Sequence, residues 1–286
     1  MDQQYLAPST LKQATDYLCQ HKAATVLAGG TDLLVRHYDD LDLLETIVDI
    51  GNLTELQTLE TGSEVRLGAL VSHYQLATDR WLNEHVSLLP RAATEVGAPQ
   101  IRHRGTLGGN LANASPAADL APPLIALDAV VELVSADGNR ELPLADFFTG
   151  PGATKLAAGE LITAVRFTKP GPNQGGSFIK LGKRKALAIA TASIAVLVTV
   201  QGNILADVRI CLGSVAPVPL RARNTEAVLR GQAVNALPLE AAQACLQTEI
   251  SPIDDIRGTA SYRRETAAAI LVHALEQAIT EARGES

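Results

Sequence analysis

The chain has 286 residues, with 24 Lys and Arg against 31 Asp and Glu, so its formal net charge at pH 7 is −7. The composition, 47% hydrophobic and 19% charged, excludes disorder along the whole chain. The acidic balance argues against nucleic acid as a partner, because binding a phosphate backbone requires clustered Lys and Arg. The longest apolar stretch, residues 186–200, is too short to cross a bilayer, and the first residues lack the pattern of a signal peptide. We therefore expect a cytoplasmic protein of two or three domains with no membrane partner.

Three cysteines, Cys19, Cys211 and Cys245, stand far apart and form no CxxC pair. Their odd number and wide spacing argue against a disulfide framework and against an iron–sulfur or zinc site within this chain. We expect all three to be buried, unreactive thiols.

The first 54 residues alternate between helical and strand patterns. Apolar residues at helical spacing predict a helix over residues 11–21, with Ser9 or Thr10 as its cap. The elements predicted next are a strand over residues 24–28, a helix over 33–38 capped by Thr31 and Asp32, and a strand over 46–50.

A second block begins near Glu55. The elements predicted in it are a strand over residues 64–68, a short helix over 72–76, a helix over 86–97, an Ala- and Leu-rich helix after residue 119, and a strand over 129–134. The pair Asp137-Gly138 predicts a hairpin turn.

A stretch rich in Pro and Gly, residues 168–177, predicts an exposed loop or a domain boundary. Beyond it, strands are expected over residues 177–181, 189–200 and 205–212, and an Ala-rich helical region over 221–283. The predicted fold class is therefore α+β, with two small α/β blocks followed by an antiparallel sheet with helices.

Two Gly-Gly turns lie beside predicted strands or helices, one within residues 28–32 and the other within residues 106–110. Paired glycines allow a backbone to approach a ligand closely and to adopt positive φ. A helix that starts after such a turn offers free N–H groups and a positive dipole end. A diphosphate between two such turns could be held without Lys or Arg, which fits the acidic composition.

Each turn alone is a weak signal, because a single Gly-Gly after a strand is most often a plain turn. We interpret Asp32 as a helix cap, since a carboxylate beside a diphosphate would repel it. Residues 113–119 are small and polar, bury little apolar area, and are equally compatible with a ligand wall and with a loop. The sequence lacks the G-x-G-x-x-G, P-loop, G-x-S-x-G and H-E-x-x-H motifs, which argues against the corresponding nicotinamide, nucleotide, hydrolase and zinc sites.

Two long motifs then point to a family. The segments VLAGGTDLLV (26–35) and IRHRGTLGGNLANASPAADLAP (101–122) resemble the FAD-binding medium subunit of the xanthine dehydrogenase family of molybdenum hydroxylases. The similarity continues in FFTGPGATKL (147–156), ELITAVRF (160–167), SFIKLGKRKALAIATASIAV (177–196) and IDDIRGTASYRRETAAAILVHAL (253–275). It therefore covers nearly the whole chain.

The resemblance implies a fold that spacing alone does not give. Two α/β subdomains would form a vanillyl-alcohol-oxidase-type FAD-binding fold, with FAD between them. A C-terminal domain would add an antiparallel three-stranded sheet and a helix bundle. The expected domains are residues 1–54, 55–173 and 174–286.

The resemblance also implies the cofactor-binding residues. The backbone of the first turn would lie along the FAD diphosphate, the second motif would surround the diphosphate and isoalloxazine, Asp119 would bind the cofactor by hydrogen bonds, and Ile162 would pack near adenine or flavin. A basic residue from the third domain, Lys180 or, in a shifted alignment, Lys183, would reach the flavin. The residues carried over are Leu27, Ala28, Gly29, Gly30, Thr31, Asp32, Thr106, Gly109, Asn110, Asn113, Ser115, Asp119, Ile162 and Lys180.

The function implied is that of an oxidoreductase component with no catalytic or metal-binding residue of its own. Electrons would leave a molybdopterin site in a large subunit, pass two [2Fe–2S] clusters in a small subunit, reach FAD here, and leave to NAD⁺ or another acceptor. A free-standing flavin oxidase of the same fold is the alternative, although aromatic residues are few (3%) and no base beside a substrate pocket is visible. A third alternative is a scaffold that has lost its flavin, against which the intact AGGTD and TLGGN motifs argue.

Overall fold

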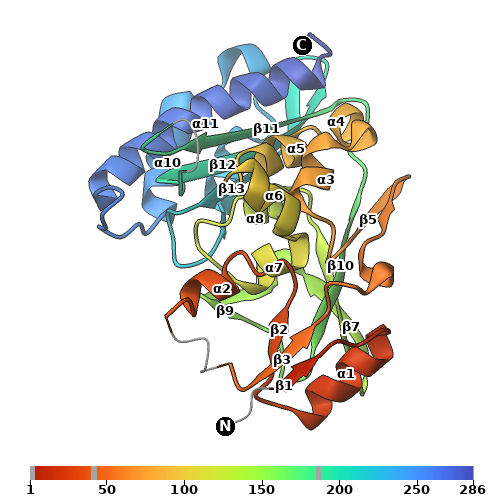
Figure 1. Ribbon diagram of the computed structural model, residues 1–286. Helices are drawn as coiled ribbons and strands as arrows, with labels where there is room; N and C mark the ends of the chain where they lie inside the picture. The colour runs from red at the N-terminus through yellow and green to blue at the C-terminus, as the bar shows by residue number, and fades with distance from the viewer. Residues whose placement is uncertain (1–3, 40–43, 185–187, 286) are drawn as a thin grey trace.

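Three β-sheets and one short two-stranded ribbon organise the computed structural model, which describes residues 4–39, 44–184 and 188–285 (Figure 1). The first sheet lies at one end of the molecule and the third at the other, and a group of short helices lies between them (Figure 1). Each large sheet takes its strands from a different stretch of the chain.

The first sheet is parallel, with the order β1 (Gln4–Leu6), β3 (Thr46–Asp49), β2 (Thr25–Leu27). Helix α1 (Leu11–Gln20) joins β1 to β2, and the Thr10 hydroxyl caps it by accepting a hydrogen bond from the Gln13 amide. Its apolar face buries Ala14 and Leu18 in a small core. The four-residue helix α2 (Leu33–Arg36) follows the first glycine turn.

The second sheet is antiparallel and has five strands. Their order is β4 (Leu59–Glu60), β5 (Glu64–Gly68), β10 (Leu161–Thr168), β6 (Val130–Ser135) and β7 (Gly138–Pro143). Six short helices connect β5 to β6: α3 (His73–Thr78), α4 (Arg80–His85), α5 (Leu88–Thr94), α6 (Pro99–Arg104), α7 (Leu107–Ala112) and α8 (Ala121–Ala126). The ribbon of β8 (Phe148–Gly150) and β9 (Ala153–Thr154) precedes β10.

The third sheet is antiparallel, with the order β11 (Gln174–Leu181), β12 (Ala192–Gln201), β13 (Ile204–Gly213), β14 (Leu220–Arg221). The long helix α11 (Ala260–Ala282) covers one face, beside α9 (Arg223–Leu229) and α10 (Leu239–Glu249) (Figure 1). The other face packs on α5 and α8. Strand β12 is therefore buried on both faces, with Ile194 and Val196 toward α11 and Ala195 and Leu197 toward the central core.

The predicted fold class is confirmed, with one addition to the expected three-stranded sheet, the two-residue strand β14. The loop predicted over residues 168–177 is shorter than expected, because β11 already begins at Gln174. The helix predicted over residues 86–97 is confined to α5. We keep the domain boundaries after residues 54 and 173 as a proposal, which the separate strand content of the three sheets supports.

The cysteines depart from expectation at two positions. All three thiols are free, but Cys19 is exposed, whereas Cys211 is buried and Cys245 is half-buried. Burial raises the pKa of the Cys211 thiol, which keeps it unreactive as predicted. Among the helices of the described residues, none combines the length and apolar character that crossing a membrane requires.

Gly175 tests the close packing of α11 on β11. A Cβ there would overlap the carbonyl oxygen of Ala278 and the amide nitrogen of Ala282, and would lie 2.9 Å from the Ala282 Cα. We expect Gly175→Ala to lower the free energy of unfolding by about 1–3 kcal/mol, measured by urea denaturation. The matched control is Gly171→Ala, whose Cβ would meet nothing nearer than 3.8 Å. Equal midpoints for the two variants would contradict the prediction.

Candidate functional site

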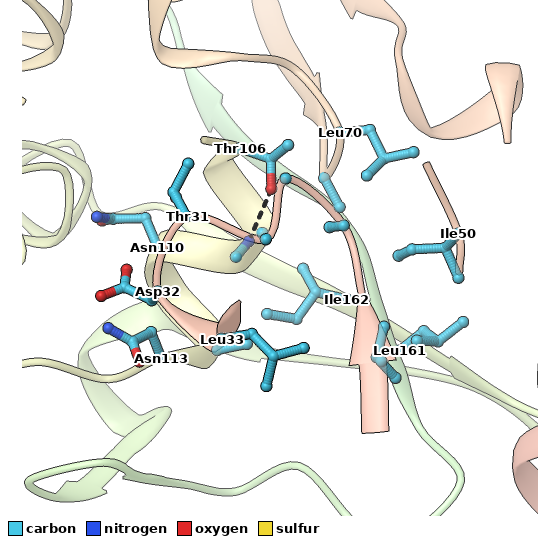
Figure 2. A pocket seen from close by; sticks show the side chains of 18 of the residues that line it. Thr31, Asp32, Leu33, Ile50, Leu70, Thr106, Asn110, Asn113, Leu161 and Ile162 are labelled. Carbon is cyan, nitrogen blue, oxygen red and sulfur yellow. Dashed lines mark hydrogen bonds between the residues drawn. The ribbon is translucent and has the colours of Figure 1, made fainter. Parts of the chain in front are cut away.

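A cleft of about 350 Å³ lies where the two glycine turns meet (Figure 2). It is lined from the first turn and α2, from α7, and from the start of β10. Ten residues predicted from the sequence line it: Ala28, Gly29, Gly30, Thr31, Asp32, Thr106, Gly109, Asn110, Asn113 and Ile162.

Direct backbone contact joins the first turn to residues 104 and 105, which immediately precede the second turn. A Cβ at Gly29 would overlap the carbonyl oxygen of Arg104 and would lie 3.0 Å from the Gly105 Cα. In the second turn, a Cβ at Gly108 would lie 2.7 Å from the Ala69 Cβ. Glycine is required at these two positions because one backbone crosses another there.

The two turns differ in their free hydrogen-bond donors. At the second turn, the amides of Leu107 and Gly108 donate to the carbonyls of Val71 (2.9 Å) and Ala69 (2.7 Å), and the Gly109 amide donates to the Thr106 hydroxyl (3.1 Å). At the first turn, the amides of residues 29–31 donate to no group within the described chain, and Gly30 has a positive φ of 73°. The expectation of free N–H groups at both turns therefore holds only for the first.

Polar side chains gather on one side of the cleft, where Thr31, Asp32, Asn110 and Asn113 lie near one another (Figure 2). The Asn110 Oδ1 is buried and has no partner among the described residues. Asp32 stands at the N-cap position of α2, but its carboxylate accepts no capping hydrogen bond, so its predicted role as a cap is wrong. An unpaired buried amide oxygen costs stability unless a ligand satisfies it.

An apolar wall faces this polar side, formed by Ile50, Leu70, Leu161 and Ile162 (Figure 2). Of these, the sequence analysis named only Ile162. Leu161 and Ile162 are neighbours on β10 and yet both line the cleft, at a point where the pairing of β10 with β6 shifts between Ile162 and Ala164. A shift of this kind turns side chains away from strict alternation, and the sequence carries no signal for it.

Four predicted residues do not line the cleft. Leu27 ends β2, and Ser115 lines a second cavity of about 160 Å³. Asp119 and Lys180 form a buried ion pair, with 2.7 Å between Asp119 Oδ2 and Lys180 Nζ.

The Asp119–Lys180 pair stands beside the cleft. Lys180 Nζ also donates to the carbonyl of Glu95 (2.9 Å), and the next residue, Val96, lines the cleft. Lys183, the alternative of the shifted alignment, instead donates to the carbonyl of Ile256. The geometry therefore favours Lys180 over Lys183 as the basic residue of the third sheet that lies beside the cleft.

Burial raises the pKa of Asp119 to about 6, and the Lys180 charge and hydrogen bond offset part of this rise. Its second oxygen, Oδ1, is buried without a partner in the part of the chain that the structure describes. At neutral pH the carboxylate is ionised and the pair is electrically balanced.

His73 is a cleft residue that the sequence analysis missed. It begins α3, is buried, and has an Nδ1 atom without a partner among the described residues. Its Nε2 lies beside Gly105, 3.0 Å from where a Cβ of that residue would stand. Burial, with the nearby charge of Arg102, lowers the pKa of His73 to about 4, so the ring is neutral at pH 7.

Comparison with known proteins identifies the family. The model described as "FAD binding domain in molybdopterin dehydrogenase" matches residues 1–170, and "CO dehydrogenase flavoprotein C-terminal domain" matches residues 177–278. The chain belongs to the FAD-binding family of the molybdopterin dehydrogenases. This confirms the resemblance that the motifs indicate.

Relatives of this flavoprotein family match along the whole chain. The xanthine dehydrogenase FAD-binding subunit of Escherichia coli O157:H7 is 31% identical, over 98% of this chain and 97% of the relative. The nicotinate dehydrogenase FAD-subunit of Eubacterium barkeri is 32% identical, over 93% and 92%. The structure of a carbon monoxide dehydrogenase chain from Hydrogenophaga pseudoflava superimposes with a TM-score of 0.93, at 33% identity and 97% coverage of both chains. Like these relatives, the chain is an oxidoreductase component.

The cleft of this flavoprotein fits FAD on three counts. Free amide N–H groups at the first turn suit an anionic diphosphate. The unpaired Asn110 side chain can donate and accept hydrogen bonds. The apolar wall suits a flat aromatic ring, which gains most from apolar contact.

Gly29→Ala tests the contact between the two turns. The added Cβ would push Gly29 away from the Arg104 carbonyl, so we expect FAD affinity to fall by about tenfold or more, measured by fluorescence titration of the apoprotein. Gly150→Ala is the control, because its Cβ would meet nothing nearer than 3.9 Å. FAD affinity that is equal in both variants and in wild type would refute the role of the contact.

The buried, neutral His73 predicts how the free energy of unfolding depends on pH. An unfolded histidine has a pKa near 6.5 and the folded one about 4, so the unfolded state binds the proton first as pH falls through this window. We expect the free energy of unfolding to fall between pH 6.5 and 4 by on the order of 3 kcal/mol from this residue, and His73→Leu to remove that part of the slope. His273→Leu, at an exposed position, is the control. An unchanged slope in His73→Leu would rule out the buried neutral ring.

Proposed function

We propose that this FAD-binding subunit takes electrons from [2Fe–2S] clusters of a small partner subunit and passes them to NAD⁺ or another acceptor. The assembly would include a large subunit with the molybdenum cofactor and would act in the cytoplasm. The observation that carries the proposal is that the first glycine turn, at Gly29, touches the backbone of Arg104 and Gly105 directly before the second turn, and that both turns line one cleft. The named relatives, FAD subunits of xanthine and nicotinate dehydrogenases, support it.

The first turn provides the anion-binding part of the site. Its free amides, at residues 29–31, would hold the diphosphate, and Gly30 permits the positive φ that the turn adopts. Asn110 and Asn113 would add side-chain hydrogen bonds that fix the orientation of the cofactor. When bound, FAD supplies the capacity to accept and release electrons.

The remaining cleft residues control water and charge. Leu161 and Ile162 would pack against the aromatic ring of the cofactor and exclude water from it. Lys180 places a positive charge near the cleft, which favours negative charge on a reduced flavin. Asp119 balances this charge at neutral pH, and near pH 6 its carboxyl group takes up a proton. We expect Leu27, Ser115, Asp119 and Lys180 to support the cofactor from outside the cleft.

The purified chain tests the proposal. We expect flavin absorbance bands, FAD as the flavin released on heating, and no oxidase turnover with purines, aldehydes or N-heterocycles. Tagged chain expressed in its own cells should co-purify with iron–sulfur and molybdenum subunits. After anaerobic reduction, reoxidation by NAD⁺ and by an artificial dye separates the two kinds of acceptor.

Two results would overturn this function. A colourless chain that also fails to bind added FAD would remove the cofactor assignment. Steady turnover by the isolated chain would favour the free-standing oxidase. Gly29→Ala is the control for flavin bound elsewhere on the protein.

A further inference from the structure

A fully buried arginine lies in the C-terminal motif that the cofactor cleft does not use. Arg263, in the first turn of α11, is 1% exposed. Its Nη1 donates to the carbonyls of Thr191 (2.7 Å) and Ser214 (2.8 Å), and its Nη2 donates to Asp255 Oδ1 (2.6 Å). Arg257 and Arg263 together hold the pKa of Asp255 well below its usual range, so the buried guanidinium keeps an ionised partner.

One of these carbonyls connects Arg263 to the second glycine motif. Ser214 follows β13 and has a positive φ of 64°, a strained conformation for a residue other than glycine. Its amide donates to the carbonyl of Pro116 (2.7 Å), within the segment 115–119. Arg263 and Pro116 are thus linked through Ser214, whose carbonyl binds Arg263 and whose amide binds Pro116.

The other carbonyl connects Arg263 to the ion pair beside the cleft. The Thr191 amide donates to the carbonyl of Leu181 (2.7 Å), the residue after Lys180. Lys180 in turn binds Asp119, at the end of the same segment 115–119. One guanidinium therefore binds two segments of the third sheet region, one at Thr191 and one at Ser214. Both segments are connected by hydrogen bonds to residues 115–119 of the FAD motif.

We propose that Arg263 is a positioning residue for the cofactor site. It fixes Ser214 where its amide binds Pro116, and it fixes the end of β11 where Lys180 binds Asp119. The planar fork of the guanidinium is required, because a lysine cannot donate to three separate acceptors in one plane. The inference rests on the proposed function, in that the Lys180–Asp119 pair acts on bound FAD. An arginine that served only folding would change stability without changing the properties of the flavin.

A double-mutant cycle tests the proposal. Arg263→Lys keeps the charge and removes the fork, and Lys180→Met removes the group through which Arg263 is proposed to act. We expect Arg263→Lys to weaken FAD binding about tenfold and to make the midpoint potential of the flavin more negative. In the Lys180→Met background, the same change should alter FAD affinity by less than about threefold and leave the potential unchanged.

The neighbouring Arg264→Lys is the matched control, and we expect it to leave FAD affinity and potential as in wild type. If Arg263→Lys fails to fold, Asp255→Asn is the second variant, because it weakens the hold on the same guanidinium without removing it. We expect it to shift FAD affinity and the midpoint potential of the flavin in the same directions. Lowered thermal stability with unchanged affinity and potential would overturn the proposal, as would fully additive effects in the cycle.

These results separate the inference from the proposed function. A wild-type chain that binds no FAD overturns both. A wild-type chain that binds FAD, with Arg263→Lys indistinguishable from it in affinity and potential, overturns the inference alone.

Discussion

The contact between Gly29 and the backbone at Arg104 is the constraint on which the site depends. It brings the first, parallel sheet against the helices of the second block, and the cleft exists only because no side chain stands between them. The second turn is itself bound to the end of β5 through Ala69 and Val71. The cleft is thus formed at a junction of three chain segments, and two of their backbones meet directly at Gly29.

The two glycine turns at this junction are alike in sequence but differ in what their backbone amides bind. The second turn uses its amides to bind the scaffold, so it can offer a ligand only side chains such as those of Asn110 and Asn113. The first turn makes no such bonds within the described residues and keeps its amides available. Rigidity on one side and free donors on the other give a preorganised anion site, which lowers the entropy cost of binding.

Local signals in the sequence predicted local structure well. Thr10 caps α1, residues 64–68 form β5, and a hairpin turn at Asp137-Gly138 joins β6 to β7, because caps, alternation and turn residues act over a few positions. The glycine turns were also recognised, and ten of the predicted residues line the cleft. Asp32 was misread as a cap, since the same residue types suit caps and binding loops.

Long-range features could not be predicted from spacing. The Asp119–Lys180 pair joins positions 61 residues apart, and the family resemblance indicated each residue but not their contact. His73 lies in no motif, and Leu161 lies in the ELITAVRF segment without a role assigned to it. Their place in the cleft follows from tertiary packing and a shift in strand pairing. The order of these features along the chain has a consequence for biosynthesis. Every residue lining the cleft lies between Val26 and Ile162, so the ribosome completes the pocket before it makes Lys180 or Arg263. Lys180 and Arg263, which support the site from outside the cleft, are therefore among the last of its residues to be synthesised.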